Sequence, residues 1–185
     1  DMTGGHPFNE VFFEDVRIPK ANLVGEENRG WYTLAVALDF ERSGVEYSAG
    51  ARRTVDELVQ FWREAGGQSR TDALVRRRLA ELAVQAEVSR LVSYRVAWMQ
   101  SKGEVPNMEA SMAKLLGTEL LQRVAREGMS MLGLYGQLEP GSRYAPLQGR
   151  IEEAALLSTS ATIAAGTSEI QRNIIATRGL GLPRG

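Results

Sequence analysis

Beyond Gly25, apolar residues recur every three to four positions, which is the spacing of one face of a helix. Glycines, prolines and capping residues divide this pattern into long stretches. The stretches cover residues 26–65, 71–101, 106–132 and about 148–163. Long amphipathic helices joined by short connections predict an antiparallel four-helix bundle, so we expect a mainly α fold.

A different pattern precedes the helices. Residues 8–19 (FNEVFFEDVRIP) are aromatic and β-branched and end at a proline, which predicts one or two short strands. One or two strands do not form a stable sheet by themselves. We therefore expect this β segment to need partner strands that residues 1–185 do not contain.

A short loop, Ala164-Ala165-Gly166, separates the fourth helix from a final one. Ser168, followed three residues later by Gln171, predicts a capping box at the start of that final helix. The helix would direct unpaired N–H groups and its positive dipole end toward the loop, a favourable setting for a phosphate or an oxyanion. Taken alone, such a loop is most often only the start of a capped helix.

Composition excludes several other chemistries. The chain has no cysteine and a single histidine, His6, so thiolate metal sites, histidine metal bundles and a serine–histidine triad are disfavoured. The net charge of −1 and the mixed charges suggest neither nucleic acid nor an anionic membrane as a partner. The sequence contains no apolar run of the roughly 18 residues that span a bilayer, and we expect a cytoplasmic protein.

Residues 166–173 read GTSEIQRN and close on RGLGLP at 178–183, and residues 38–42 read LDFER. The first two motifs resemble the C-terminal signature of the acyl-CoA dehydrogenase family, and the third resembles the start of the first long helix of that family's C-terminal domain. Residues 8–19 resemble the last strands of its middle β-domain. The resemblance covers the back half of a family member and implies a fragment of the middle β-domain in residues 1–25 and the helical-bundle domain in residues 26–185.

The resemblance implies FAD-dependent α,β-dehydrogenation of an acyl-CoA thioester, with electron-transfer flavoprotein as electron acceptor. The residue before the signature Gly-Thr pair is often the catalytic glutamate, but here it is Ala165. A minority of members, the isovaleryl-CoA and long-chain types, carry the base on the first long helix, directly before an arginine. Glu41 occupies that position, so the resemblance implies Glu41 as the base. In a helical protein of another family, Glu41 and Arg42 would be interpreted as ordinary surface charges. The backbone N–H of Ala165 would still bind the thioester oxygen.

Other site residues follow from the same match. Asp39 and Arg42 correspond to positions along the CoA pantetheine, and Gly166, Thr167, Ser168 and Glu169 correspond to the flavin-side loop. Glutamine is usual at the position of Glu169. No metal ligand is implied.

Two elements that family members offer to a neighbouring subunit's flavin are altered here. The Arg-x-x-Phe-Gly element reads REAGG at 63–67, without the phenylalanine, and the Gln-x-x-Gly-Gly-x-Gly loop reads SMLGLYG at 130–136, without the glutamine and one glycine. This pattern resembles bacterial dehydrogenases built from two unlike subunits. It also resembles homo-oligomeric members in which the residues that bind the ADP half of the flavin are altered. We expect a homo- or hetero-oligomer (a dimer of dimers), acting on long, dicarboxylic, branched or sterol-derived acyl-CoAs. A non-catalytic structural subunit is the alternative, and we expect residues 1–185 alone to be inactive.

Overall fold

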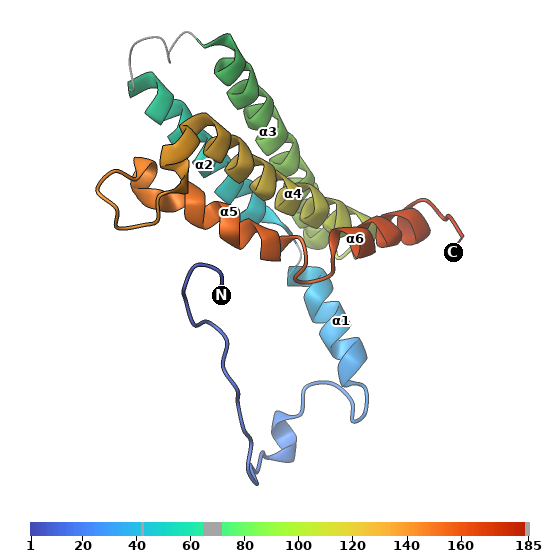
Figure 1. Cartoon of the computed structure of the whole chain (residues 1–185). Helices are drawn as coiled ribbons and strands as arrows, with labels where there is room; N and C mark the ends of the chain where they lie inside the picture. Colours follow the sequence, from blue (N-terminus) through green and yellow to red (C-terminus); the bar gives the residue numbers. More distant parts are fainter. Residues whose placement is uncertain (42, 65–71, 184–185) are drawn as a thin grey trace.

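A computed structural model describes residues 1–41, 43–64 and 72–183, without the side chains of residues 39 and 40. The chain is mainly helical, as the hydrophobic pattern predicts. Its long helices are α2 (Val45–Glu64), α3 (Ala73–Ser101), α4 (Asn107–Leu132) and the shorter α5 (Arg150–Ala161). Figure 1 shows these helices packed as a bundle, with α1 (Gly30–Glu41) projecting from it. The predicted helical bundle is therefore confirmed.

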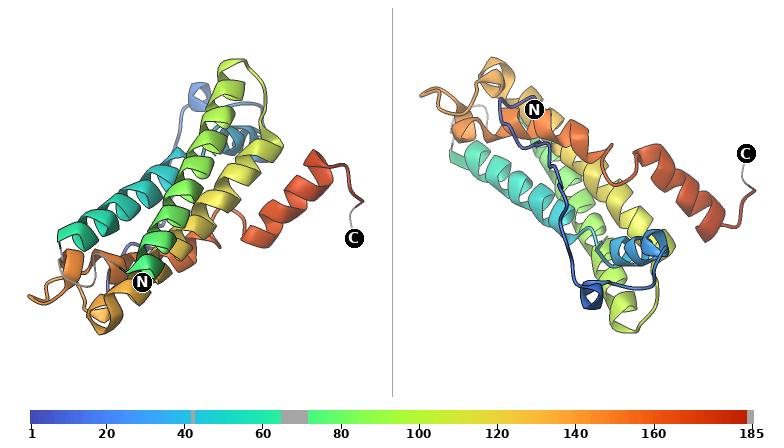
Figure 2. Two further views of the ribbon diagram at one scale, coloured as in Figure 1. Left: turned by 90° about the horizontal axis from the view of Figure 1, so that it is seen from above. Right: turned by 90° about the horizontal axis from the view of Figure 1, so that it is seen from below.

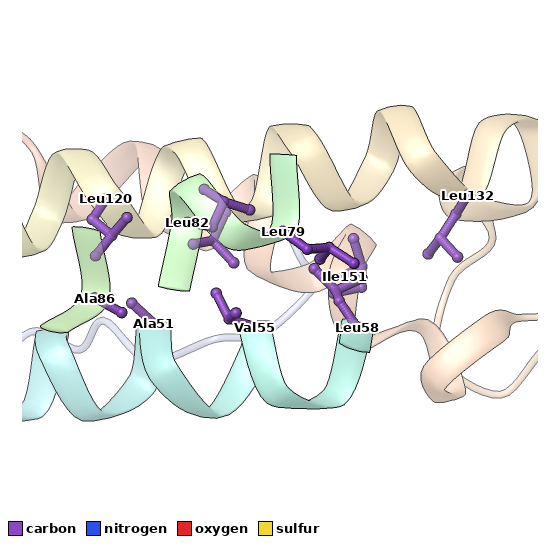
Figure 3. Close-up of a cluster of buried hydrophobic side chains, with 10 residues drawn as sticks. Ala51, Val55, Leu58, Leu79, Leu82, Ala86, Leu120, Leu132 and Ile151 are labelled. Carbon is purple, nitrogen blue, oxygen red and sulfur yellow. The ribbon is translucent and has the colours of Figure 1, made fainter. Parts of the chain in front are cut away.

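The bundle is held by one main apolar core, to which each of its helices contributes. Val55 and Leu58 of α2, Leu82 of α3, Val124 of α4 and Ile151 of α5 are all essentially inaccessible to solvent. Figure 3 shows this cluster between the helices. Burying one side chain of this size contributes roughly 1.5–3 kcal/mol. The core thus fixes α4 as the central helix against which the other elements are positioned.

The first predicted helix is broken in two. Instead of running from residue 26 to residue 65, it ends at Glu41 and resumes at Val45. Gly44 has a φ of 69°, a left-handed conformation that an uninterrupted α-helix cannot contain. A Cβ atom on Gly44 would lie 3.1 Å from the Cβ of Ala113 on α4. The break therefore lets the chain turn directly on the surface of α4.

The predicted strands do not form: no strand occurs in any part of the chain that the structure describes. Residues 8–19 are exposed and bend at Asp15, which has a φ of 48°, and Phe8, Phe12 and Phe13 keep 77–85 % of their accessible surface. The residue types favour strands, but a strand needs a partner for its backbone hydrogen bonds. A short 3₁₀ turn, Lys20–Asn22, comes directly after this segment.

Helix ends follow local side-chain chemistry. Asp72 caps α3, because its carboxylate accepts hydrogen bonds from the N–H groups of Leu74 (2.8 Å) and Val75 (3.2 Å). Gly133, with a φ of 59°, ends α4 and leads into a 3₁₀ turn, Gly133–Gln137. A second turn, Pro146–Gly149, delays the start of α5 to Arg150, because Leu147 and Gln148 are left-handed.

The last helix, α6 (Ser168–Ile174), continues as a π-helical turn, Ile175–Gly179. Figure 2 shows this segment leaving the bundle beside α4. An ion pair between Arg172 and Glu119 (2.7 Å) and a hydrogen bond from Arg178 to Asn107 (2.8 Å) fasten it to α4. In the described part of the chain, no helix has the length and apolar character needed to span a membrane.

Candidate functional site

The loop between α5 and α6 has an unusual backbone. Ala165 has a φ of 54° and Gly166 a φ of 94°, so two successive residues adopt positive φ values. A side chain at Gly166 would place its Cβ 2.7 Å from the Nε2 atom of Gln171. Gly166 is therefore required both by its backbone conformation and by the close approach of Gln171. The loop is a tight turn rather than a flexible connection.

The capping box predicted for Ser168 and Gln171 is wrong by one residue. Thr167 is the N-cap, because its backbone is extended and its hydroxyl accepts a 3.3 Å hydrogen bond from the N–H of Ile170. Ser168 is the first residue of α6, and its buried hydroxyl has no partner within the described chain. Gln171 turns back to the loop instead of to the cap.

Two buried side chains hold the loop by its carbonyl groups. Gln171 donates from Nε2 to the carbonyl oxygens of Ala165 (3.1 Å) and Gly166 (3.3 Å). Lys114, from the middle of α4, donates from Nζ to the Gly166 carbonyl oxygen at 2.7 Å. By contrast, the N–H groups of Ala165 and Gly166 bond to nothing within the described residues. The turn thus has a bonded carbonyl side and a free amide side.

The start of α6 lines a groove of about 700 Å³. Thr167, Ser168 and Glu169 form one side of the groove, together with the end of α5. The opposite side is polar and comes from α4: Glu119, Gln122, Arg123, Arg126 and Glu127. The structure therefore gathers three of the four predicted cofactor-binding residues around one concave surface, and Gly166 adjoins it in sequence.

Glu169 carries its charge within this groove. Its pKa lies below the ordinary value of 4.5, chiefly because its own backbone N–H and then the Thr167 hydroxyl hydrogen-bond to the carboxylate. The charges of Arg172 and Lys114 lower this pKa further. Glu169 is therefore ionised at neutral pH.

Glu41 lies at the C-terminal end of α1, with an exposed side chain. Its charge acts on Tyr47: the pKa of Tyr47 is raised first by burial, then by Glu46 and by Glu41. Tyr47 in turn packs on Gly117 of α4, as Gly44 packs on Ala113. One stretch of α4, residues 113–117, thus supports the segment that follows Glu41 and also carries Lys114, which holds the loop.

Glu41 and the loop are joined by no hydrogen bond or ion pair in the described part of the chain. What they share is residues 113–117 of α4, which contact the segment after Glu41 through Gly44 and Tyr47 and the loop through Lys114. Arg42 and the side chain of Asp39 fall outside the description, so their predicted contacts with CoA stay predictions.

Sequence reasoning missed Lys114 and misassigned Gln171. Lys114 lies within the third apolar stripe, between Ala113 and Leu115, where a charged residue usually marks the solvent side of a helix. In the structure it is only 2 % exposed. No local pattern distinguishes the two cases, because the Gly166 carbonyl that binds Lys114 is 52 residues away.

The altered cross-subunit elements lie away from this loop in sequence. Ala65 and Gly66 fall outside the described residues. At the other element, Ser130 accepts a 3.2 Å hydrogen bond from Arg78 of α3, so the serine hydroxyl has a partner within its own chain.

The sequence matches the family described as acyl-CoA dehydrogenase, C-terminal domain, over residues 28–180. This chain belongs to the acyl-CoA dehydrogenase family. It is 38 % identical to the acyl-CoA dehydrogenase FadE26 of Mycobacterium tuberculosis, over 97 % of this chain and 47 % of that protein. The acyl-CoA dehydrogenase FadE29 of the same organism is 32 % identical over 98 % of this chain and 47 % of its own length. The chain therefore spans about half the length of the curated relatives it matches.

Solved structures of the family have the same fold. A chain of the ChsE4-ChsE5 complex from Mycobacterium tuberculosis superposes with a TM-score of 0.80 and 37 % identity, covering 94 % of this chain and 46 % of that one. A variant of the Tcur3481-Tcur3483 steroid ACAD gives a TM-score of 0.85 at 30 % identity, with the same two coverages. Both structures are described as pairs of differently named proteins.

Proposed function

We propose that the full-length protein containing this chain is an FAD-dependent acyl-CoA dehydrogenase that introduces an α,β double bond into an acyl-CoA thioester. The observation that carries this proposal is the loop at Ala165 and Gly166, whose carbonyl groups are tied to Gln171 and Lys114 while its amide groups remain free. Free, fixed N–H groups are suited to bind an oxygen on which negative charge develops. Family membership supplies the thioester as the source of that oxygen.

The proposed chemistry divides between a base and an oxyanion donor. Glu41 removes the α-proton of the thioester, and the N–H of Ala165 hydrogen-bonds to the thioester oxygen as the enolate forms. A carboxylate becomes a strong enough base only when it loses water contacts. Glu41 is exposed in this chain, so we expect the remaining domains of the full-length protein to cover it. Asp39 and Arg42 line the route of the pantetheine.

The residues of the groove fit a flavin nucleotide. Ser168 presents a buried hydroxyl without a partner, and Thr167 and Glu169 line the same surface with Gly166 beside them. These residues would hold part of the FAD at the start of α6. The bound flavin would supply the acceptor for the β-hydride, and electron-transfer flavoprotein would then remove the electrons. Glu169, being ionised, would be the least favourable of these contacts for a diphosphate.

Assembly and substrate are proposed from the relatives. We place residues 1–25 at the end of a middle β-domain and residues 26–185 in the C-terminal domain, because the exposed aromatic side chains of residues 8–13 need partner strands. The pairs of unlike names among the solved relatives support a hetero-oligomer. A solved relative described as a steroid ACAD supports sterol-derived acyl-CoAs among the candidate substrates. We expect a cytoplasmic enzyme.

A second candidate is a non-catalytic or partner-dependent structural subunit. It is favoured by the alanine at position 165, where a carboxylate is usual, and by the bond that engages Ser130 within its own chain. Flavin colour separates the two candidates. A yellow full-length protein that bleaches with an acyl-CoA is catalytic, whereas a protein that stays colourless with every unlike partner is structural.

The decisive experiment replaces Glu41 with glutamine in the full-length protein. Flavin content should be unchanged, while anaerobic bleaching of the flavin by acyl-CoA should slow by at least ~10²–10⁴-fold, the usual contribution of a general base. Glu46→Gln is the matched control, because Glu46 is an exposed glutamate close to the same Tyr47. Near-normal bleaching in the Glu41 variant would show that the base is another residue.

A further inference from the structure

Lys114 is buried although it carries a charge. Its side chain is 2 % exposed, and it reaches from α4 to a backbone carbonyl in another segment, at Gly166, with a distance of 2.7 Å. Removing an ammonium group from water is costly, and an apolar side chain could fill the same space without that cost. Stability alone is therefore a poor reason for a lysine at this position.

The position of the bound carbonyl groups determines where the amide groups point. Each peptide unit is planar and trans, so its C=O and N–H point in opposite directions. Anchoring the Ala165 carbonyl to Gln171 directs the N–H of Gly166 away from Gln171. Anchoring the Gly166 carbonyl to Lys114 and Gln171 likewise directs the N–H of Thr167 away from α4.

The amide side of the turn is unused by the described chain. The N–H groups of Ala165, Gly166 and Thr167 donate no hydrogen bond to any described residue. The turn also begins at a positive φ of 54° in Ala165, a strained value for a residue with a side chain. Such a conformation persists only when neighbouring contacts enforce it, and the bonds from Gln171 and Lys114 are the contacts that do so here.

We propose that Lys114 is a positioning residue for thioester activation. This inference rests on the proposed function, in which the N–H of Ala165 binds the thioester oxygen. The bonds from Lys114 and Gln171 fix the N–H groups of Gly166 and Thr167 directly. They also hold the backbone of Ala165 in its turn conformation, so the N–H of Ala165 is held in place before charge develops on the oxygen. Hydrogen bonding to the Gly166 carbonyl polarises that peptide unit and strengthens the N–H of Thr167 as a further donor on the amide side of the turn. The charge of Lys114 extends to this region, since it also lowers the pKa of Glu169.

The test uses the full-length holoprotein and three variants. Lys114→Met keeps an unbranched side chain that is one atom shorter, and it removes the charge and the hydrogen-bond donors. Gln171→Met removes the other two bonds to the turn and leaves Lys114 in place, which keeps the test valid if Lys114→Met fails to fold. Lys102→Met is the matched control, because Lys102 is an exposed lysine at the end of α3.

The first readout is the rate of flavin bleaching by the acyl-CoA that reacts in the Glu41 experiment. The second is the infrared frequency of that acyl-CoA, bound to the protein and labelled with ¹³C at the thioester carbonyl. Misplacing a reacting group by about 1 Å can cost ~10²-fold in rate. We expect Lys114→Met to slow bleaching by roughly 10–100-fold with less than a threefold change in KM. The carbonyl frequency should move toward that of the free thioester, and Gln171→Met should give a smaller change in the same direction.

The outcomes separate this inference from the proposed function. If Lys114 has a purely structural role, Lys114→Met should have a lower melting temperature and a lower flavin content. The carbonyl frequency and the rate per bound flavin should then equal those of the wild type. This result would overturn the positioning role and leave the proposed function intact. A wild-type protein that never bleaches with an acyl-CoA overturns both proposals. A Lys102→Met control that matches Lys114→Met in both readouts would likewise exclude a specific role for Lys114.

Discussion

A Cβ atom on Gly117 of α4 would lie 2.7 Å from the Cβ of Tyr47 on α2. The two helices therefore approach closely at this point only because residue 117 has no side chain. Gly44 makes a similar approach to Ala113, one turn earlier on α4. These two contacts fix the start of α2 on α4.

The first prediction concerns this contact. Gly117→Ala should destabilise the protein by about 1–3 kcal/mol, because the added methyl group forces α2 away from α4 and this strain outweighs the helix propensity that alanine gains. Thermal or urea unfolding measures the change. Gly50→Ala is the control: it also lies within a helix, but its Cβ would meet only a Leu121 methyl group at 3.7 Å. A Gly117→Ala protein as stable as Gly50→Ala would contradict the packing described.

The second prediction moves the base. Placing a glutamate at Ala165 in the Glu41→Gln background should restore part of the lost bleaching rate, because the family supports a base at either position and position 165 already adopts the required turn. Ala165→Gln in the same background is the control, since it has the same size without a carboxylate. If both double variants are equally slow, position 165 does not face the α-carbon and the proposed geometry of the site is wrong.

The successes and failures of sequence reasoning have local and long-range causes. Asp72 was predictable as a cap because the N–H groups it binds are two and three residues away. The sequence identifies the signature loop but points to Ser168 as the cap instead of Thr167, since both residues carry a hydroxyl and only the backbone angles decide between them. The break at Gly44 and the role of Lys114 depend on contacts across the bundle, at Ala113 and Gly166, which no local spacing reveals.

The third prediction follows from the lowered pKa of Glu169. A carboxyl group stabilises the fold when its pKa is lower in the folded than in the unfolded protein. The stabilisation is complete when the pH is above the pKa of the unfolded protein, and it is lost as the pH falls through the pKa of the folded protein. Glu169→Gln should therefore be less stable than the wild type at pH 7, and the difference should shrink below the ordinary pKa of 4.5. Chemical denaturation at several pH values measures this difference. A gap that widens in acid would mean that the pKa of Glu169 is raised.

The fourth prediction concerns assembly, and it begins from the altered cross-subunit elements. A flavin diphosphate that lacks a usual donor from the neighbouring subunit loses charge-assisted hydrogen bonds worth roughly 1.5–3 kcal/mol each, or one to two powers of ten in affinity per bond. Full-length protein expressed alone should therefore be poor in flavin. Co-expression with an unlike family member that carries an intact Arg-x-x-Phe-Gly element should give about one flavin per heterodimer.

Two substitutions test the cause of this dependence. Gly66→Phe and Ser130→Gln together restore the phenylalanine of one element and the glutamine of the other, so they should raise the flavin content of the lone protein. Ser130 accepts a hydrogen bond from Arg78, which also forms an ion pair with Glu127 (3.2 Å). Replacing Ser130 with glutamine therefore removes that hydrogen bond as well as adding an amide donor. Ser130→Ala separates these effects, because it removes the hydrogen bond without adding an amide. A lone wild-type homo-oligomer with one flavin per chain would show that other residues bind the diphosphate, and the unlike-subunit assembly would then be unnecessary.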